Sequence, residues 1–110
     1  MPETKPRAPS HLRPDTAKWW LEVVSDFELE PHHVKLLTLA AEALDRATQA
    51  REAIKKDGAY LPGRYEGSIR AHPAIGVERD SRLAFARLVR ELGLDGDAQP
   101  SRPPRIAGRY

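Results

Sequence analysis

The feature that most constrains this chain is a long helical stretch at its centre. Residues 31–57 contain no glycine, and their single proline, Pro31, stands first, where a helix tolerates the missing backbone N–H. Gly58 follows directly and is a typical helix stop. At about 1.5 Å per residue such a helix is roughly 40 Å long. A single domain of 110 residues cannot cover it on all sides, so we expect neighbouring copies of the chain to bury part of it.

This stretch is rich in alanine, with leucine and isoleucine between the small residues. The alanines are Ala40, Ala41, Ala43, Ala47, Ala50 and Ala53. Because small side chains allow two helix backbones to come close together, these positions predict close packing against another helix.

A shorter helix is expected before the long one, over residues 15–26. Asp15 or Thr16 can cap its start, and Trp20 and Val23 share one apolar face. Two adjacent tryptophans cannot both face the same core. We therefore expect Trp19 to flank the core or to meet another subunit.

The third helix is expected to open at Pro73 and to run to about Leu92, where Gly93 ends it. His72, just before it, is expected to cap or pack at the start of this helix. The apolar stripe that this helix would bury consists of Val77, Ala84, Phe85, Leu88, Val89 and Leu92.

The remaining segments do not follow a helical pattern. Residues 58–72 contain Pro-Gly and Glu-Gly pairs and predict a loop or a small β-hairpin. Residues 1–14 hold four prolines and predict a flexible arm, and residues 96–110 predict a basic flexible tail. The predicted fold is mainly α, a three-helix protomer with a long central helix, disordered termini and one helical domain over residues 15–95.

Composition limits the compartments and the partners. The chain has no cysteine, so disulfides and thiolate metal sites are excluded. It has no apolar run of about 20 residues and no apolar signal region at its start, so we expect no membrane partner and a cytoplasmic location. The net charge is only +2, but residues 1–30 hold 4 basic and 6 acidic side chains whereas residues 73–110 hold 7 and 5. This asymmetry permits a nucleic-acid partner without requiring one.

Arginines on the third helix are the first candidate DNA contacts. Arg79, Arg82, Arg87 and Arg90 fall within an arc of about 140° on a helical wheel. Arginine suits phosphate because it is always charged and offers a planar fork of donors. Glu78, Asp80 and Glu91 border the arc, so a solvated face or salt bridges between subunits is the alternative interpretation.

The tail supplies the second candidate set. Arg102, Arg105 and Arg109 have only Asp95 and Asp97 as nearby acidic residues. A basic segment without a core can wrap an anionic partner and become ordered on contact. The alternative is a tail that only adds solubility.

The start of the long helix offers weaker signals. The first two helices resemble a helix-turn-helix, in which His32, His33 and Lys35 could reach phosphate, although ordinary helical hairpins have the same spacing. Adjacent histidines point about 100° apart on a helix and do not chelate a metal as an i, i+4 pair does. There is no phosphate-binding loop, no Ser-His pair and no isolated carboxylate pair, so we expect no catalytic residue, no metal and no cofactor.

Residues 70–95 resemble the C-terminal signature of the tailed-phage terminase small-subunit family. The similar features are His72-Pro73-Ala74, Glu78-Arg79-Asp80, the run Phe85-Ala86-Arg87-Leu88, and Leu92-Gly93-Leu94. Upstream, WWLEVVSDFELEPHHVKLL and ALDRATQAREAI are similar to the first two helices of the family. The resemblance covers about residues 16–95.

The resemblance implies a non-enzymatic helical protomer that assembles into a closed homo-oligomeric ring. Such a ring binds the packaging-initiation site on double-stranded phage DNA in the host cytoplasm and recruits the terminase large subunit, which holds the ATPase and the nuclease. The family has no DNA-contacting motif that can be placed on this sequence, so the arginines above are physical candidates. Two other functions remain open, a dimeric helix-turn-helix transcription regulator and an assembly scaffold that does not bind DNA.

Overall fold

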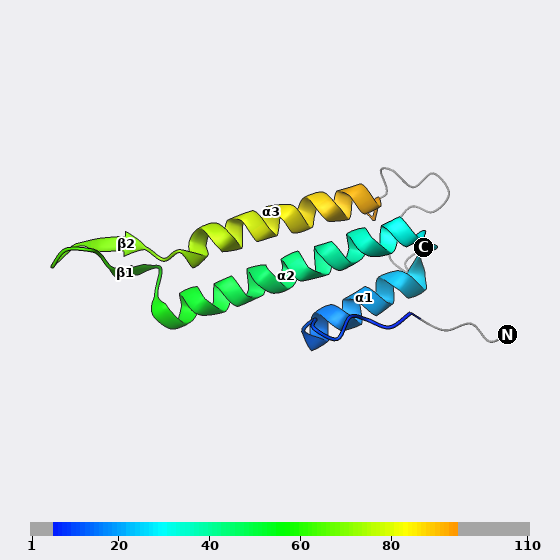
Figure 1. The fold of residues 1–110 in the computed structure, drawn as a ribbon, viewed down its shortest axis with the longest axis horizontal. Helices are drawn as coiled ribbons and strands as arrows, with labels where there is room; N and C mark the ends of the chain where they lie inside the picture. The colour runs from blue at the N-terminus through cyan, green and yellow to red at the C-terminus, as the bar shows by residue number, and fades with distance from the viewer. Residues whose placement is uncertain (1–5, 95–110) are drawn as a thin grey trace, which may run out of the picture.

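The computed structural model describes residues 6–94, which form three helices and one two-stranded sheet (Figure 1). The elements in chain order are α1 (Pro14–Asp26), α2 (Pro31–Asp57), β1 (Tyr60–Pro62), β2 (Ile69–Ala71) and α3 (Ala74–Leu92). The mainly α fold, the long central helix and the β-hairpin before the last helix are confirmed.

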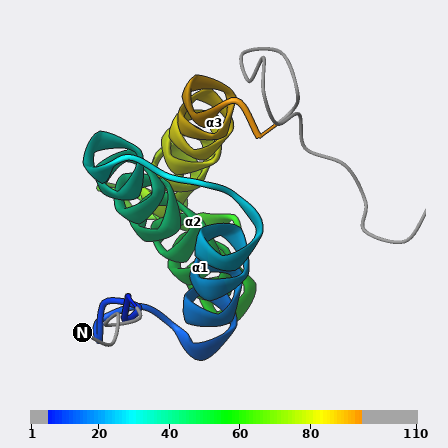
Figure 2. The ribbon, with the colours of Figure 1, turned by 90° about the vertical axis from the view of Figure 1, so that its right-hand side faces the viewer.

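Helices α2 and α3 lie side by side and antiparallel, and α1 packs along the first half of α2, where it also contacts the C-terminal half of α3 (Figures 1 and 2). Ala40, Ala43, Ala47 and Ala50 are all buried. Their spacing of three and four residues places them on one stripe of α2, which faces α3. This alanine seam is therefore used within the protomer. Only the other faces of α2 are open to a neighbouring copy.

Helix α3 meets the alanine seam with a stripe that differs in part from the predicted one. Leu92 is buried as expected, but Val77 is 46% exposed and Ser81 is buried instead. Val77 lies near the end of the helix pair that α1 does not reach, so only α2 is available to cover it (Figure 1). Ser81 is small enough to fit opposite the alanines.

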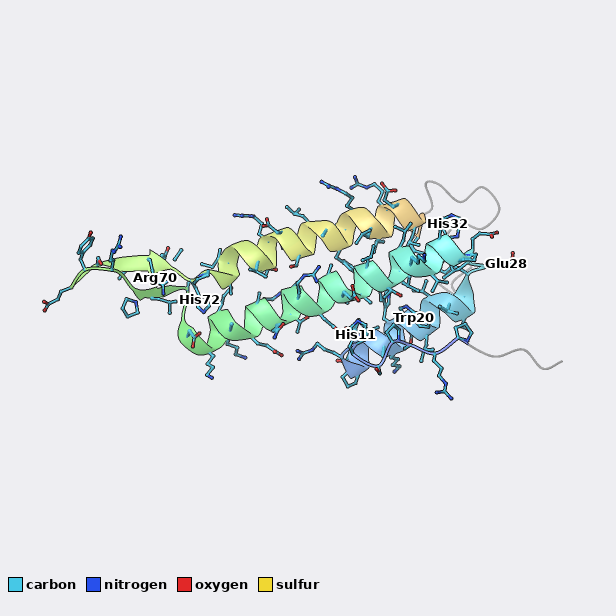
Figure 3. All side chains as sticks on the ribbon, in the orientation of Figure 1. His11, Trp20, Glu28, His32, Arg70 and His72 are labelled. Carbon is cyan, nitrogen blue, oxygen red and sulfur yellow. The ribbon has the colours of Figure 1, made fainter. Side chains whose placement is uncertain are left out.

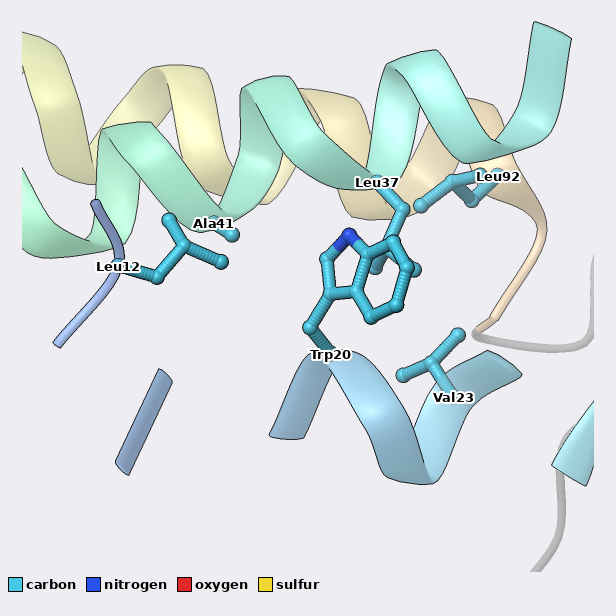
Figure 4. Close-up of a cluster of buried hydrophobic side chains, with 6 residues drawn as sticks. All are labelled: Leu12, Trp20, Val23, Leu37, Ala41 and Leu92. Atoms are coloured by element: carbon cyan, nitrogen blue, oxygen red, sulfur yellow. The ribbon is translucent and has the colours of Figure 1, made fainter. Parts of the chain in front are cut away.

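The apolar core lies where all three helices meet (Figure 4). It consists of Leu12, Trp20, Val23, Leu37, Ala41 and Leu92. The buried Trp20 ring keeps its polar atom satisfied, because Nε1 donates a hydrogen bond to Thr38 Oγ1 at 3.2 Å. Trp19 flanks this core and packs its ring against Phe85 of α3, with the ring centroids 5.5 Å apart. The expectation that Trp19 flanks the core is thus confirmed.

Part of the segment predicted as a flexible arm is packed against the helices. Within the expected flexible segment 1–14, Leu12 is only 7% exposed and belongs to the core. Arg13 pairs with Glu52 at 2.7 Å, and His11 contacts Glu42 at 2.8 Å. The prolines disfavour a helix here, but a turn, in which the Leu12 N–H donates to the Pro9 carbonyl at 3.3 Å, still places this leucine in the core.

The start of α1 is stabilised by α2 and not by the residues predicted to cap it. The N-cap residue is Arg13, which makes no side-chain cap. The carboxylate of Asp45 instead accepts hydrogen bonds from the Arg13 backbone N–H, at 2.9 Å, and from the Thr16 hydroxyl. A carboxylate at this place also suits the positive end of the α1 dipole. The predicted capping by Asp15 or Thr16 is therefore wrong.

The other helix ends follow the sequence signals. Pro31 is the first residue of α2, and Glu30 and His33 form a capping box in which His33 Nδ1 accepts the Glu30 N–H at 3.0 Å. Gly58 and Gly93 end α2 and α3 with φ values of 87° and 78°, which other residues rarely adopt.

His72 joins α2 to α3, as its predicted place at the start of the last helix suggested. Its Nδ1 accepts the Ala74 N–H at 3.0 Å, and its Nε2 lies 2.9 Å from Asp57 Oδ2. The side chain is mostly buried. The two helices are thereby held together at the base of the β-hairpin (Figure 3).

The alanine seam predicts a steric limit on stability. Ala47→Leu should lower the free energy of unfolding by about 1–3 kcal/mol, because added methylenes have no room between α2 and α3. Gln49→Leu, on the exposed side of the same helix, should stay within about 0.5 kcal/mol. Urea unfolding followed by circular dichroism measures both. Equal effects of the two substitutions would show that the seam is not tightly packed.

Candidate nucleic-acid interface

The candidate arginines of α3 lie on one solvent-exposed face. Arg79, Arg82, Arg87 and Arg90 are exposed, as the helical wheel predicted, and we call them the arginine face. Leu83 lies among them and is 53% exposed. The opposite side of α3 packs on α2, so the arginine face points away from the helix pair.

Two of these four arginines have acidic partners within the chain. Arg82 Nε lies 3.3 Å from Glu78 Oε2, one helical turn before it. The same oxygen lies 3.4 Å from Arg51 Nε of α2, so Glu78 bridges the two helices. Arg79 lies 3.4 Å from Asp80, and both side chains are largely exposed. Arg79 and Arg82 therefore have ion-pair partners within the protomer, whereas the alternative of salt bridges between subunits stays a prediction.

Arg87 and Arg90 differ from the other two. Within residues 6–94, neither has a hydrogen bond or an ion pair. Glu91, one helical turn after Arg87, was expected to border the arc, but no ion pair joins it to an arginine among these residues. Arg90 also lies in the last turn of α3, where a cation suits the negative end of the helix dipole. The unpaired charge of the arginine face is therefore concentrated at the C-terminal end of α3.

The second candidate set, Arg102, Arg105 and Arg109, lies outside the described residues. The tail beyond residue 95 thus remains a sequence-based prediction.

The start of α2, which the sequence predicted as a weak candidate for DNA contact, is poorly suited to bind phosphate. His33 is engaged in the capping box, and the His32 ring lies against the His33 ring with centroids 4.1 Å apart. Glu28 and Glu30 are exposed beside this helix start, where they would repel phosphate. Across residues 6–94, no three histidine or acidic side chains gather closely enough to hold a metal ion.

A further basic cluster was not singled out from the sequence. Lys55 and Lys56 end α2, while Arg64 and Arg70 belong to the β-hairpin beside it. All four are exposed. They are separated along the chain by the hairpin turn, so only the pairing of β1 with β2 brings them to one end of the molecule (Figure 1).

Comparison with known families decides what the chain is related to. Residues 17–101 match the protein family described as phage terminase, small subunit, which is more than half of the chain. This chain belongs to the phage terminase small-subunit family. The match covers nearly all of α1, then α2, the β-hairpin and α3, and it confirms the resemblance noted at His72-Pro73-Ala74 and Glu78-Arg79-Asp80. No curated protein and no solved structure matches the chain.

The general role is thus that of a terminase small subunit. The structure shows on which surfaces of this subunit the charged side chains lie. In this family member, the described helices include none that is both long and apolar enough to cross a membrane. The arginine face and the basic end near the β-hairpin are separate surfaces of one elongated protomer (Figure 3).

The two ion pairs of Glu78 predict that this carboxylate contributes more to the stability of the terminase small subunit than that of Asp80 does. Glu78→Gln removes two ion pairs and should lower the free energy of unfolding by about 0.5–1 kcal/mol, since both arginines are half exposed. Asp80→Asn, whose carboxylate is 74% exposed, should change it by less than about 0.5 kcal/mol. Urea unfolding at low and high salt provides the measurement. A Glu78→Gln variant as stable as the wild type at low salt would show that these two ion pairs do not stabilise the fold.

Proposed function

We propose that this chain is the DNA-recognising, non-catalytic small subunit of a phage packaging motor. In this proposal it forms a closed homo-oligomeric ring in the host cytoplasm, binds double-stranded phage DNA at the packaging-initiation site, and brings that DNA to the large subunit, which holds the ATPase and the nuclease. Membership of the terminase small-subunit family carries the general role. The distribution of unpaired arginines on α3 supports DNA contact.

The physical argument for DNA rests on Arg87 and Arg90. Among residues 6–94 they have no acidic partner, so within these residues no ion pair competes with a phosphate for them. Arginine stays charged at every physiological pH and can hold a phosphate through two parallel N–H groups. Arg79 and Arg82 would first have to give up Asp80 and Glu78.

The small net charge of +2 is compatible with DNA binding if several copies act together. The arginine face offers two arginines without an ion-pair partner among residues 6–94, and a few phosphate contacts give weak, salt-sensitive binding. When several copies are held in one assembly, the first DNA contact brings the arginine faces of the other copies close to the same DNA. Each further contact then forms at a high effective concentration, and the total affinity rises. Assembly and DNA binding are thus coupled in this proposal, because the affinity depends on the number of arginine faces presented at once.

The helix-turn-helix regulator is the weaker alternative. It requires the N-terminal end of α2 to enter the major groove. That end is flanked by the exposed carboxylates of Asp26, Glu28 and Glu30. His33 there is already used to cap the helix. The remaining alternative, a scaffold that does not bind DNA, predicts no measurable DNA affinity at any salt concentration.

The proposal predicts unequal contributions from the two halves of the arginine face. Arg87→Ala with Arg90→Ala should weaken binding to double-stranded DNA and reduce the slope of log affinity against log salt by about 0.9 for each phosphate that the variant no longer neutralises. The matched double variant Arg79→Ala with Arg82→Ala should have the smaller effect. Fluorescence anisotropy over a salt series measures both. The reverse order would place the DNA-binding surface at the start of α3, and wild-type protein without affinity would favour the scaffold.

The tail is tested separately. Removal of residues 96–110 takes away Arg102, Arg105 and Arg109 and should weaken DNA binding while the oligomeric mass stays that of the full assembly. Light scattering behind a sizing column and the same anisotropy titration provide the two measurements. Unchanged affinity would show that the tail only adds solubility.

A further inference from the structure

The β-hairpin presents an apolar face that nothing in the described chain covers. The register pairs Tyr60 with Ala71 and Pro62 with Ile69, so these four side chains lie on the same face of the two-stranded sheet. Tyr60 is 65% exposed and Ile69 is 69% exposed. Tyr65 in the turn adds a third large exposed side chain, at 71%. A cluster of large apolar residues this exposed on a polar chain marks a contact surface for another molecule.

The β-hairpin also has an open backbone edge. Its two strands are linked beyond their ends by bonds from Gly63 N–H to Ser68 and from His72 N–H to Ala59, each at 2.8 Å. By the alternation of an antiparallel pair, the N–H and C=O groups of Ile69 and Ala71 then point away from β1. The edge of β1 is less accessible, because Pro62 has no N–H and its carbonyl accepts Arg70 Nε at 3.2 Å. An isolated two-stranded hairpin is only marginally stable in water, so it gains from a partner.

The positive charge around the β-hairpin indicates which kind of surface can bind it. The end of α2 and the β-hairpin carry four exposed cations, Lys55, Lys56, Arg64 and Arg70. Their acidic neighbours are Glu66 and Asp57, and Asp57 is already bonded to His72 at 2.9 Å. The β-hairpins of two copies would repel one another through these cations, whereas a surface with both leucine and carboxylate side chains would attract them.

The outer face of α1 has this chemistry. Glu22 and Asp26 are exposed there without an ion-pair partner among residues 6–94. Leu21 lies beside them and is 45% exposed. An open hollow lined by Pro6, Leu21, Val24 and Ser25 separates the N-terminal segment from this helix. We call these residues the acceptor face. It offers an apolar depression beside the carboxylates of Glu22 and Asp26, with the exposed Lys18 one helical turn before Glu22.

We infer that the β-hairpin of one protomer docks on the acceptor face of a second copy of this chain. The exposed Tyr60, Ile69 and Tyr65 cover Leu21 and the hollow, while the four cations of the β-hairpin end lie against Glu22 and Asp26. Within one chain the two surfaces lie on different parts of the elongated fold (Figure 1), so they cannot satisfy each other. This inference rests on the self-assembly in the proposed function and does not involve DNA.

The contact is heterologous, meaning that it joins two different surfaces. Each protomer then keeps one free β-hairpin and one free acceptor face after the first contact. Repetition of such a contact gives a closed ring where the rotation closes and an open filament where it does not. A symmetric pairing of two hairpins would stop at a dimer.

Two variants that each lack one surface provide the test. The hairpin variant carries Arg64→Glu and Ile69→Thr, and the acceptor variant carries Glu22→Lys and Asp26→Lys. These substitutions lie at exposed positions, and threonine suits a strand as lysine suits a helix. Arg46→Glu, an exposed and unpaired position of α2 among the described residues, is the matched charge-reversal control. Light scattering behind a sizing column gives the masses, and circular dichroism checks that each variant folds.

The wild type and the Arg46→Glu control should assemble, while each double variant alone should associate at least about tenfold more weakly. Mixed one to one, the two double variants should form a species of two protomers, each of 12.3 kDa, and nothing larger, because the mixture retains a single functional contact. An acceptor variant that assembles like the wild type overturns the inference and leaves the proposed ring intact. A hairpin variant of unchanged mass also overturns it, and assigns the β-hairpin to DNA or to another protein. A wild type that stays monomeric at all concentrations contradicts the proposed assembly itself.

Discussion

The close approach of α2 and α3 along the alanine seam is the constraint on which the rest of the molecule depends. Ala40, Ala43, Ala47 and Ala50 are buried on α2, which packs along α3, and the small Ser81 of α3 is buried too. Small side chains bury little apolar area each, so the energy of this contact comes from many close atomic contacts along two straight helices. The result is a rigid helix pair in a protein of 110 residues.

This rigidity separates three surfaces that a more globular fold of the same size would bring together. The arginine face lies on the outer side of α3, the β-hairpin extends from one end of the helix pair, and the acceptor face lies on α1 beside the other half of α2 (Figures 1 and 2). The large apolar side chains are concentrated around Trp20 and Leu37, where α1, α2 and the end of α3 meet. At the opposite end, His72 and Glu78 connect the two long helices by polar contacts. The apolar residues of the β-hairpin thus remain available for contacts with another molecule.

Much of this arrangement could be predicted from the sequence because it depends on local chemistry. Helix period, proline at first helical positions, and glycine at the ends of α2 and α3 depend on residues only a few positions apart. What could not be predicted depends on residues distant in the chain. Asp45 stabilises the start of α1 from about thirty positions away. Val77 is exposed because α1 ends up on the other half of α2, which no pattern within α3 reveals.

In the candidate site, too, local features could be predicted from the sequence and contacts between distant residues could not. The wheel correctly placed the four arginines of α3 on one exposed face, but it could not distinguish them by their partners. Glu78 pairs with Arg51 of α2 as well as with Arg82, so the charge balance of Arg82 depends on tertiary packing. The β-hairpin cluster was missed for a related reason, since Lys55 and Arg70 come together only through the reversal of the chain between α2 and α3.

In the proposed function, the separation of these surfaces lets a small subunit of low net charge bind DNA through many weak contacts. If the β-hairpin and the acceptor face bind protein, their charges are neutralised between copies and do not compete for phosphate. In this proposal Arg87 and Arg90, together with the tail arginines, contribute to the DNA affinity of each protomer, and the number of joined copies raises the affinity of the whole assembly. Many weak phosphate contacts around an assembly can break and re-form one at a time while the others hold the DNA. A few strong contacts do not allow such stepwise exchange. The alanine seam supports this arrangement, because only a stiff helix pair keeps the arginine faces of successive copies at a fixed orientation.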